Sequence, residues 1–370
     1  MLARTFKLSL VTAFIVATFT VTETSNAQDV YRFRLDGNWT DVTDGTSPGW
    51  GLNPNNGPGN PPGSLPGPGD ETRVNFGNNT VTVDSDVPDV LRLRIGVDES
   101  GIVDVNNGGV LTATEDIHVG NNGFDVVATM NVNDGGEVNV GRILWVARDL
   151  VGTNSLGLLN INTGGTVNVA SHLWWGVFQQ GEINISGTLN QTGGILGLGT
   201  LNAVDPSLGT ATVNILSGGS LNLNNIDAGE VSGSPRLGSI QDGSVIDIQG
   251  TGELTLPGNF EAVIQNYVDA NKIIGNGVNG AVDINVVLLP GGPGDFDNDD
   301  DIDGADFLAY QRDTNVGDLS DFTDNYGAGS LEMTVVTAQA PAVASVPEPS
   351  AVVLLFGSLL TATCVRKRSS

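Results

Sequence analysis

The middle of the chain repeats a short motif in which apolar and polar residues alternate. Seven segments align on it: Val74-Asn75-Phe76, Val103-Asp104-Val105, Met130-Asn131-Val132, Leu159-Asn160-Ile161, Ile183-Asn184-Ile185, Val213-Asn214-Ile215 and Ile246-Asp247-Ile248. Successive segments begin between 24 residues (159 to 183) and 33 residues (213 to 246) apart. A period of this size predicts a stack of coils, each of which buries its apolar face against its neighbours.

The alternation also predicts which side chains point inward. Apolar residues that alternate with polar ones mark a strand with one buried face, and the Gly-Gly pairs that follow four of the segments permit sharp bends. We therefore predict a mostly β fold, a parallel, right-handed β-helix or solenoid over residues 74–258. The second residues of the segments then form an outer column whose amides hydrogen-bond from coil to coil. A β-sandwich or a propeller is the alternative architecture, although the irregular spacing counts against a propeller.

Both ends of such a stack need a cover, because an open coil exposes unpaired strand edges. Residues 28–73 are predicted to cap the first coil with Trp39 and Trp50. Residues 259–292 are predicted to cap the last coil, with a helix over 260–274 followed by a strand over 281–289. The helix is indicated by apolar residues that share one face at helical spacing: Phe260, Val263, Ile264, Tyr267 and Val268.

A second aligned position carries large side chains in four successive coils. The segments are Leu93-Arg94-Ile95, Ile117-His118-Val119, Leu144-Trp145-Val146 and Leu173-Trp174-Trp175. If the flanking residues face inward, Arg94, His118, Trp145 and Trp174 line one outer stripe, with the two indoles face to face at the ~4.8 Å strand spacing. Exposed tryptophans beside Arg and His suit sugar rings, so the stripe is a candidate polysaccharide-binding site. The alternative is that these aromatics only stack on each other or lie beneath residues 149–158.

An acidic run follows the second cap and a linker over residues 290–294. Six carboxylates occupy positions 1, 3, 5, 7, 9 and 12 of a loop, the positions from which an EF-hand surrounds calcium: Asp295, Asp297, Asp299, Asp301, Asp303 and Asp306. Ile302 at position 8 and the apolar stretch after Asp306 fit the same pattern. Calcium is therefore the predicted cofactor, and a solvated acidic linker is the alternative.

Aspartate at position 12 of the loop resembles the type I dockerin version of the motif, so residues 294–329 look like a small helical EF-hand or dockerin-like module. Two features depart from that family. Asp300 stands where a glycine is usual, and residues 318–327 resemble only the second helix of the other dockerin half, without its loop. The resemblance is to a degenerate dockerin. It implies one ion instead of two, and it does not favour a cohesin partner.

The two ends of the chain carry sorting patterns. Arg4 and Lys7 precede an apolar stretch over 8–21, and small residues at 25–27 suit a signal peptidase, so residues 1–27 are a predicted signal peptide. Residues 347–370 combine a Pro-Glu-Pro tripeptide, an apolar run over 351–365 and a basic end. The residues of this signal are Pro347, Glu348, Pro349, Arg366, Lys367 and Arg368.

This C-terminal pattern resembles the PEP-CTERM sorting tail of exported bacterial proteins. The resemblance implies an exosortase-type processing enzyme as partner, attachment to the membrane through a C-terminal hydrophobic helix, and a linker over residues 330–346. The glycine-rich repeats resemble the autotransporter-adhesin-like repeats of planctomycete and related exported proteins. We therefore expect an exported protein of the cell envelope, cell surface or extracellular space.

Composition excludes several functions. Asp and Glu number 42 against 15 Lys and Arg, a formal charge of −27 that repels phosphate backbones and disfavours nucleic acid. The single cysteine, Cys364, permits no intramolecular disulfide. The chain has no HExxH motif, no GxSxG motif and no phosphate-binding glycine loop. The expected function is that of a non-catalytic surface or matrix protein. The alternative is a glycan-binding or polysaccharide-processing component, and a cohesin-docked subunit is the least favoured hypothesis.

Overall fold

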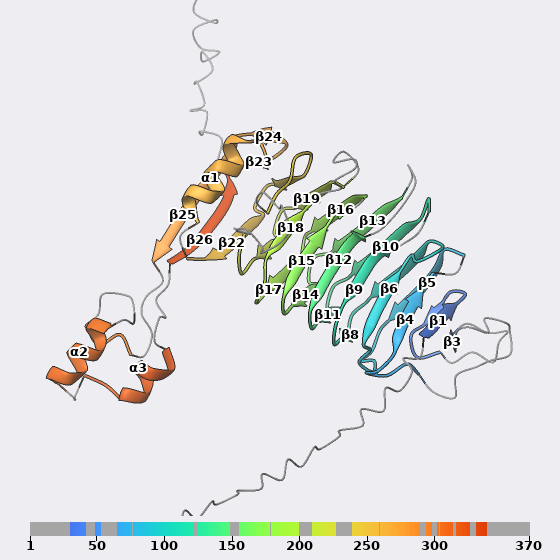
Figure 1. Cartoon of the computed structure of the whole chain (residues 1–370), viewed down its shortest axis with the longest axis horizontal. Coiled ribbons are helices and arrows are strands. Elements are labelled where there is room, and N and C mark those ends of the chain that lie inside the picture. The colour runs from blue at the N-terminus through green and yellow to red at the C-terminus, as the bar shows by residue number, and fades with distance from the viewer. Residues whose placement is uncertain are drawn as a thin grey trace, which may run out of the picture.

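The structure is a computed structural model of the whole chain, shown in Figure 1. It describes residues 30–41, 49–52, 65–75, 77–121, 124–148, 155–177, 179–199, 209–226, 239–258, 260–288, 294–297, 302, 304–313, 316–325 and 331–338. These residues are mostly β-strand, and the strands form three sheets, which we call A, B and C. The helices are α1 (Glu261–Asp269), α2 (Gly304–Arg312) and α3 (Leu319–Asn325).

Each sheet is a long row of short strands. Sheet A runs in the order β18 (Leu196–Leu198), β15 (His172–Trp175), β12 (Ile143–Arg148), β9 (Ile117–Asn121), β6 (Arg92–Ile95), β4 (Glu71–Val74), β1 (Val30–Arg34) and β3 (Gly49–Leu52). Sheet B runs in the order β2 (Gly37–Asn38), β5 (Asn79–Val83), β7 (Gly101–Val105), β10 (Val127–Val132), β13 (Leu156–Ile161), β16 (Gln180–Ile185), β19 (Ala211–Ile215), β21 (Val245–Ile248), β23 (Ile273–Gly275) and β24 (Val278–Asn279). Sheet C runs in the order β25 (Val282–Leu288), β26 (Leu331–Thr337), β22 (Glu253–Pro257), β20 (Ser220–Asn222), β17 (Thr188–Gln191), β14 (Thr166–Val169), β11 (Glu137–Val140) and β8 (Val110–Ala113).

The chain visits the three sheets in turn. From β6 to β20 each strand of sheet A is followed by one of sheet B and one of sheet C, and we call each such passage a coil. Apart from β8 and β18, which end their sheets, each of these strands pairs in parallel with the strands of the coils before and after it. Figure 1 shows these strands lying side by side along the length of the molecule. The arrangement is mostly β with parallel strands, and it is compatible with the predicted solenoid.

The interior is built from columns of aliphatic residues, as the alternation predicts. In sheet B, Val103 pairs with Met130, Met130 with Leu159, and the column continues through Ile183 to Val213. All five side chains are fully buried. The column places the same inward position of each coil directly above the last, so the repeat sets the register of the sheet.

The first of the seven aligned segments was assigned to the wrong strand. Val103 pairs with Val81 of β5, whereas Val74 lies in β4 of sheet A and pairs with Ile95. A period of two looks the same in every strand of a coil, so alternation alone does not distinguish β4 from β5. The outer polar column accordingly runs from Asp104 to Thr82 and on to Asn38, and Asn75 does not belong to it.

The predicted amide rungs are present. In sheet B the side-chain amide Nδ2 of Asn131 donates to Asp104 Oδ1 at 2.7 Å, and Asn160 Nδ2 donates to Asn131 Oδ1 at 2.8 Å. Asn184 and Asn214 continue the series. Sheet C carries a second series that the sequence analysis did not single out, through Asn139, Asn168, Asn190 and Asn222. The rungs satisfy polar groups on the outer faces of both sheets.

The Gly-Gly bends lie between sheets B and C. Gly135 has φ +68°, a left-handed conformation that costs glycine little. A Cβ on the next residue, Gly136, would lie 2.5 Å from the carbonyl oxygen of Val105 in the preceding coil. The first glycine is therefore required by its backbone angle, and the second by the close approach of the coil beneath.

The N-terminal cap contains both predicted tryptophans. Trp39 and Trp50 are fully buried, and their rings meet edge to face with centroids 4.6 Å apart. Trp50 Nε1 donates to Trp39 O at 2.7 Å, which fixes the pair. Strand β3 runs antiparallel to β1 and ends sheet A, so a short strand covers the edge that an open coil would expose.

The C-terminal cap differs from the prediction in two ways. Helix α1 buries Ile264 and Val268 but ends at Asp269, and residues 273–275 form β23 instead of the last helical turn. Residues 331–337, assigned to a linker over 330–346, form β26, which pairs antiparallel with both β22 and β25. Met333 and Val335 of β26 are fully buried, because this strand also alternates apolar and polar residues.

The position of β26 makes the helical module an insertion. Strands β25 and β26 are neighbours in sheet C, and the chain between them contains α2 and α3. Figure 1 shows the two helices apart from the stack of strands. The predicted signal peptide and the sorting-tail residues Pro347, Glu348, Pro349, Arg366, Lys367 and Arg368 lie outside the described residues. Among the residues that are described, no helix is long and apolar enough to cross a membrane.

Candidate functional site on sheet A and candidate metal centre

The predicted stripe is a continuous row of paired residues across sheet A. Arg94 pairs with His118, His118 with Trp145, and Trp145 with Trp174. The row extends further than predicted, because Arg94 also pairs with Arg73, and Arg73 with Arg32. We call these six residues the outer row of sheet A: Arg32, Arg73, Arg94, His118, Trp145 and Trp174. Their neighbours along the strands, such as Leu93 and Ile95, are fully buried in the interior, so the outer row faces away from it.

The aromatic half of the outer row is stacked. The ring centroids of His118 and Trp145 are 5.9 Å apart at an interplanar angle of 22°, and those of Trp145 and Trp174 are 6.1 Å apart at 21°. The guanidinium carbon of Arg148 lies 4.5 Å from the centre of the Trp145 ring. His118 is only 1 % exposed and Trp174 only 9 %, so the expected exposure of both indoles is not found. Trp145 alone is partly exposed.

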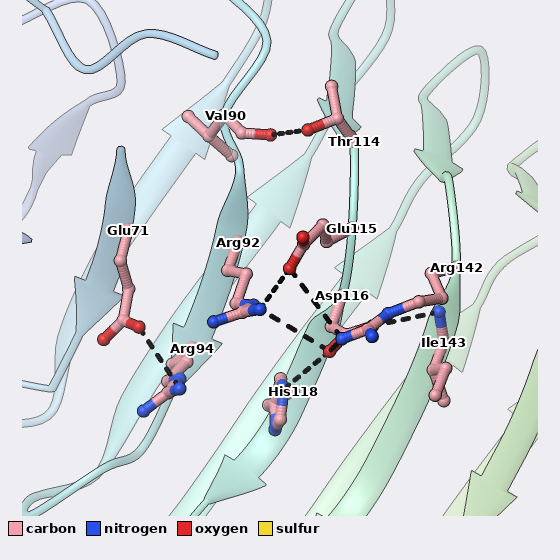
Figure 2. A network of polar contacts seen from close by, with 10 residues as sticks. All are labelled: Glu71, Val90, Arg92, Arg94, Thr114, Glu115, Asp116, His118, Arg142 and Ile143. Carbon is pink, nitrogen blue, oxygen red and sulfur yellow. Dashed lines mark hydrogen bonds and ion pairs between the residues drawn. The ribbon is translucent and has the colours of Figure 1, made fainter. Parts of the chain in front are cut away.

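Two buried carboxylates hold the arginines of this face in place. Glu71, on β4, forms ion pairs with Arg73 at 2.6 Å and with Arg94 at 3.2 Å. Figure 2 shows Glu71 beside Arg94 on the neighbouring strand. The Glu71 side chain is 5 % exposed, against 24 % for Arg94. The carboxylate therefore lies beneath the guanidinium groups that it pairs with.

Asp116 is the centre of a second network, drawn in Figure 2. Arg142 binds both of its oxygens, with Nε to Oδ1 at 2.9 Å and Nη2 to Oδ2 at 2.6 Å. The backbone N–H of Ile143 donates to Oδ1 at 3.2 Å, and His118 Nε2 lies 3.8 Å from Oδ2. Burial raises the pKa of Asp116, but His118 and Arg142 stabilise the ionised form and hold it well below its ordinary value. Arg92 pairs with the neighbouring Glu115.

His118 is a neutral histidine in the middle of this face. Burial lowers the pKa of His118 below its ordinary value, and the nearby charges of Arg148 and Arg94 lower it further, against the opposing contact with Asp116. Its Nδ1 has no hydrogen-bond partner, and neither do Trp145 Nε1 and Arg94 Nε, although all three atoms are buried. Buried polar atoms without partners are costly, and three of them lie next to one another in the outer row.

Most of the positive charge of the described chain is gathered here. Within the described residues, every Lys and Arg other than Lys272 and Arg312 lies in a strand of sheet A or directly beside one. Of these arginines only Arg94 was predicted from the sequence, whereas five others were not: Arg32, Arg73, Arg92, Arg142 and Arg148. The signal for Arg73 was available, because Thr72-Arg73-Val74 has the same pattern as Leu93-Arg94-Ile95. It was hidden because Val74 had been aligned with sheet B.

The predicted metal loop is described in part. Carboxylate oxygens of Asp295, Asp297 and Asp306 all lie within 4.8 Å of one another, so these three residues can hold a metal ion. Asp306 is fully buried in the first turn of α2, and its Oδ1 accepts hydrogen bonds from the backbone N–H groups of Phe296 at 2.5 Å and Asp297 at 3.2 Å. Asp299, Asp301 and Asp303 lie outside the described residues.

The surroundings of the cluster fit a hard cation. Ile302 is fully buried and the Phe296 ring packs beside Tyr310, with centroids 5.7 Å apart, so apolar side chains anchor the chain on both sides of the loop. Three carboxylates supply only oxygen ligands, which suit calcium and magnesium rather than a soft metal. The described donors do not distinguish between these two ions.

Comparison with known proteins adds no relative to this picture. A scan against protein-family models, a search of curated proteins and a search of solved structures find no match for the chain. Its function is therefore argued from the stack of coils, the outer row of sheet A and the aspartate cluster.

Proposed function

We propose that this protein is a non-catalytic, exported component of the cell surface or extracellular matrix, with a right-handed β-solenoid as a stiff shaft. The observation that carries the proposal is the combination of two series of amide rungs with caps at both ends of the stack. Each rung ties one coil to the next, and the caps cover strand edges that would otherwise pair with other chains. Such a stack is extended, as a shaft requires.

Export is supported by the signal pattern over residues 1–27 and by the sorting-tail pattern over 347–370. The resemblance to PEP-CTERM tails makes an exosortase-type enzyme the expected processing partner and places the chain at the envelope. The test is to express the tagged full chain in a bacterium that encodes such an enzyme, then treat intact cells with protease. Surface digestion, lost when Pro347, Glu348 and Pro349 are all changed to alanine, is expected. Retention of both proteins in the cytoplasm would contradict the proposal.

The helical module is proposed to bind one calcium ion through Asp295, Asp297 and Asp306, with Asp299, Asp301 and Asp303 completing the loop. Bound calcium would neutralise clustered carboxylates and order the insertion between β25 and β26. Calorimetric titration of the full chain is expected to show one calcium site that Asp306→Asn removes. Asp283→Asn, an exposed carboxylate on β25, is the matched control and should bind calcium normally. Equal affinity for magnesium would overturn the choice of calcium.

Polysaccharide binding is the second candidate function, and the outer row of sheet A favours it. Trp145 offers a partly exposed indole beside Arg94 and Arg148, the kind of neighbourhood in which a sugar ring stacks while its oxygens accept hydrogen bonds. The covered faces of Trp174 and His118 argue against a broad two-tryptophan platform. The arginines, rather than the aromatics, are therefore the main feature that a ligand would meet.

A further inference from the structure

Three arginines of the outer row lie side by side. Arg32, Arg73 and Arg94 pair directly on three neighbouring strands, and like charges opposite each other destabilise a sheet. Glu71 compensates two of them, and Asp98 lies 3.5 Å from the third. The pKa of Arg94 is lowered, first by burial and then by the charges of Arg73, Arg92 and Arg148, against the attraction of Glu71. Burial and three neighbouring guanidinium groups thus disfavour the charged form of Arg94, and Glu71 favours it.

The depth of the charges gives this face its sign. The buried carboxylates of Glu71 and Asp116 have side chains that are 5 % and 4 % exposed, whereas the arginines paired with them reach 24 % at Arg94 and 50 % at Arg142. Around Glu71 and Asp116 the acids therefore lie inside and the guanidinium groups outside, whereas Asp98 (59 % exposed) and Glu115 (34 %) are more exposed than Arg32 and Arg92, with which they pair. The outer layer is cationic around Arg73, Arg94 and Arg142, although the whole chain carries a formal charge of −27. A cationic strip on so acidic a chain selects and orients an anionic ligand.

The partnerless atoms specify what such a ligand must offer. Arg94 Nε and Trp145 Nε1 are buried, have no hydrogen-bond partner and can only donate. His118 is nine-tenths buried or more and lies between these two residues in the row, and its Nε2 faces Asp116, so its partnerless Nδ1 is an acceptor. The two donors therefore call for acceptor oxygens in the ligand, and Nδ1 of His118 calls for a hydroxyl donor. Carboxylates are well suited, because guanidinium groups bind them in a planar, two-point geometry.

We propose that the outer row of sheet A binds a linear acidic polysaccharide, which lies across the strands along the axis of the stack. Carboxylates of successive uronic-acid rings would meet Arg32, Arg73 and Arg94, and one ring would rest against the exposed part of Trp145. Arginines on neighbouring strands are about 4.8 Å apart, a spacing close to the advance of one sugar ring along such a chain. The inference rests on the second candidate function, polysaccharide binding, and narrows its ligand to an acidic chain. It is independent of the shaft function, which is tested by localisation.

The test is affinity electrophoresis and calorimetry of the full chain with polygalacturonate and alginate as acidic polymers, dextran as the neutral polymer and double-stranded DNA as another polyanion. Binding to at least one acidic polysaccharide, weakened by added salt and absent with dextran and DNA, is the expected result. Failure of both acidic polymers to bind would overturn the proposal. Equally strong binding to dextran would also overturn it, because the site would then recognise neutral sugars. Equally strong binding to DNA would overturn it as well, because the site would then bind any polyanion.

Single variants locate the site without removing both partners of Glu71. Arg94→Gln and Arg73→Gln are each expected to weaken binding about tenfold, because each removes a charge-assisted pair. Arg312→Gln on α2 makes the same change in net charge away from sheet A and is expected to bind like the parent protein. Circular dichroism checks that each variant is folded. If Arg94→Gln is unfolded, Arg94→Lys is used in its place, because it keeps the charge but loses the two-point geometry of the guanidinium group. Equal losses in Arg94→Gln and Arg312→Gln would show that net charge alone drives binding.

Discussion

The outer face of sheet A and the outer face of sheet B sit on the same coils but are built differently. In sheet B one position is filled by the amides of Asn131, Asn160, Asn184 and Asn214, and each donates to the coil before it. In sheet A the corresponding position changes from arginine to histidine to tryptophan across the same stretch of the stack. The first face repeats what stabilises a coil, and the second keeps like charges in contact and leaves donors without partners.

In a repeat protein, the positions that depart from the repeated residue type are the candidates for function. A residue type that recurs in every coil is explained by the contacts between coils. Residues that break the series at a cost to stability need another explanation, and ligand binding supplies one for the outer row of sheet A. We therefore predict that the asparagine rungs of sheet B stabilise the fold but do not bind the ligand. The arginines of the outer row should bind the ligand but add little stability.

The largest expected effect tests the frame that both faces share. At the corner between sheets A and B, Gly176 has φ +67°, and a Cβ there would lie 2.2 Å from the backbone oxygen of Thr210. Gly176→Ala is expected to lower the free energy of unfolding by about 3 kcal/mol or more, measured by urea denaturation, since it combines backbone strain with crowding. Gly218→Ala has similar strain but open space around its Cβ, and it should cost only about 1–2 kcal/mol. Equal costs would mean that the coils are not tightly packed at this corner.

The second effect concerns the titrating group that the outer row buries. Because burial lowers the pKa of His118, the unfolded chain takes up a proton as pH falls through about 6.5, whereas the folded chain does so only at lower pH. The free energy of unfolding should therefore fall as pH drops below about 6.5, by no more than about 1.4 kcal/mol per pH unit from this residue. His118→Gln is expected to remove this contribution to the pH dependence of the free energy of unfolding. The measurement is urea denaturation between about pH 7.5 and about pH 5.5, the range in which a histidine of the unfolded chain titrates. Identical slopes in the two proteins would show that His118 is protonated as readily when folded.

The stack of coils was predictable because its signal is repeated. The inward column through Met130 and Leu159 and the rungs through Asn160 follow from alternation alone, and so does the row from Arg94 to Trp174. Strand β26 was missed because its seven residues stand alone beyond the helical module, where no repeat supports them. Its partner β22 is distant in sequence, and such a pairing leaves no mark on local pattern.

The electrostatics of the outer row were less predictable than its position. The sequence shows that Arg94 and His118 share a face, but not that Glu71 and Asp116 lie beneath the arginines. That depends on the turn that brings Arg142 over Asp116 from the next coil. Stacking was foreseen only as an alternative, yet strands at this spacing bring aromatic rings into contact and cover their faces.

The third effect is the direct form of the comparison between the two faces. Asn160→Ala leaves Asn131 Oδ1 without its donor, and it is expected to lower the free energy of unfolding by about 1 kcal/mol. Arg94→Gln should change it by less than about 0.5 kcal/mol, because Glu71 keeps Arg73 as a partner and a partly exposed ion pair is weak. The order should reverse for binding to polygalacturonate or alginate, which Asn160→Ala leaves unchanged. If Arg94→Gln proves the more destabilising, the outer row is structural and the contrast between the faces disappears.

The smallest effect is expected at Ala147, which stands where the other coils have glycine. Its φ is +59°, as left-handed as the +67° of Gly176, and in sequence it lies between Trp145 and Arg148 of β12. Ala147→Gly relieves about 1–2 kcal/mol of backbone strain. It also loses a buried methyl group worth about 0.8 kcal/mol and makes the unfolded chain more flexible by about 0.4–1 kcal/mol. These terms oppose each other, so the free energy of unfolding should change by less than about 1 kcal/mol.

Ala147 fits because the adjacent residue of sheet B is Gly157, on which a Cβ would lie 2.5 Å from Ala147 N. Gly157→Ala is the matched reverse test at the same contact, and it should be clearly destabilising while Ala147→Gly is not. A large increase in the free energy of unfolding in Ala147→Gly would instead show that the backbone of sheet A is strained at this corner. That strain would be a further cost to stability on the face that carries the arginines.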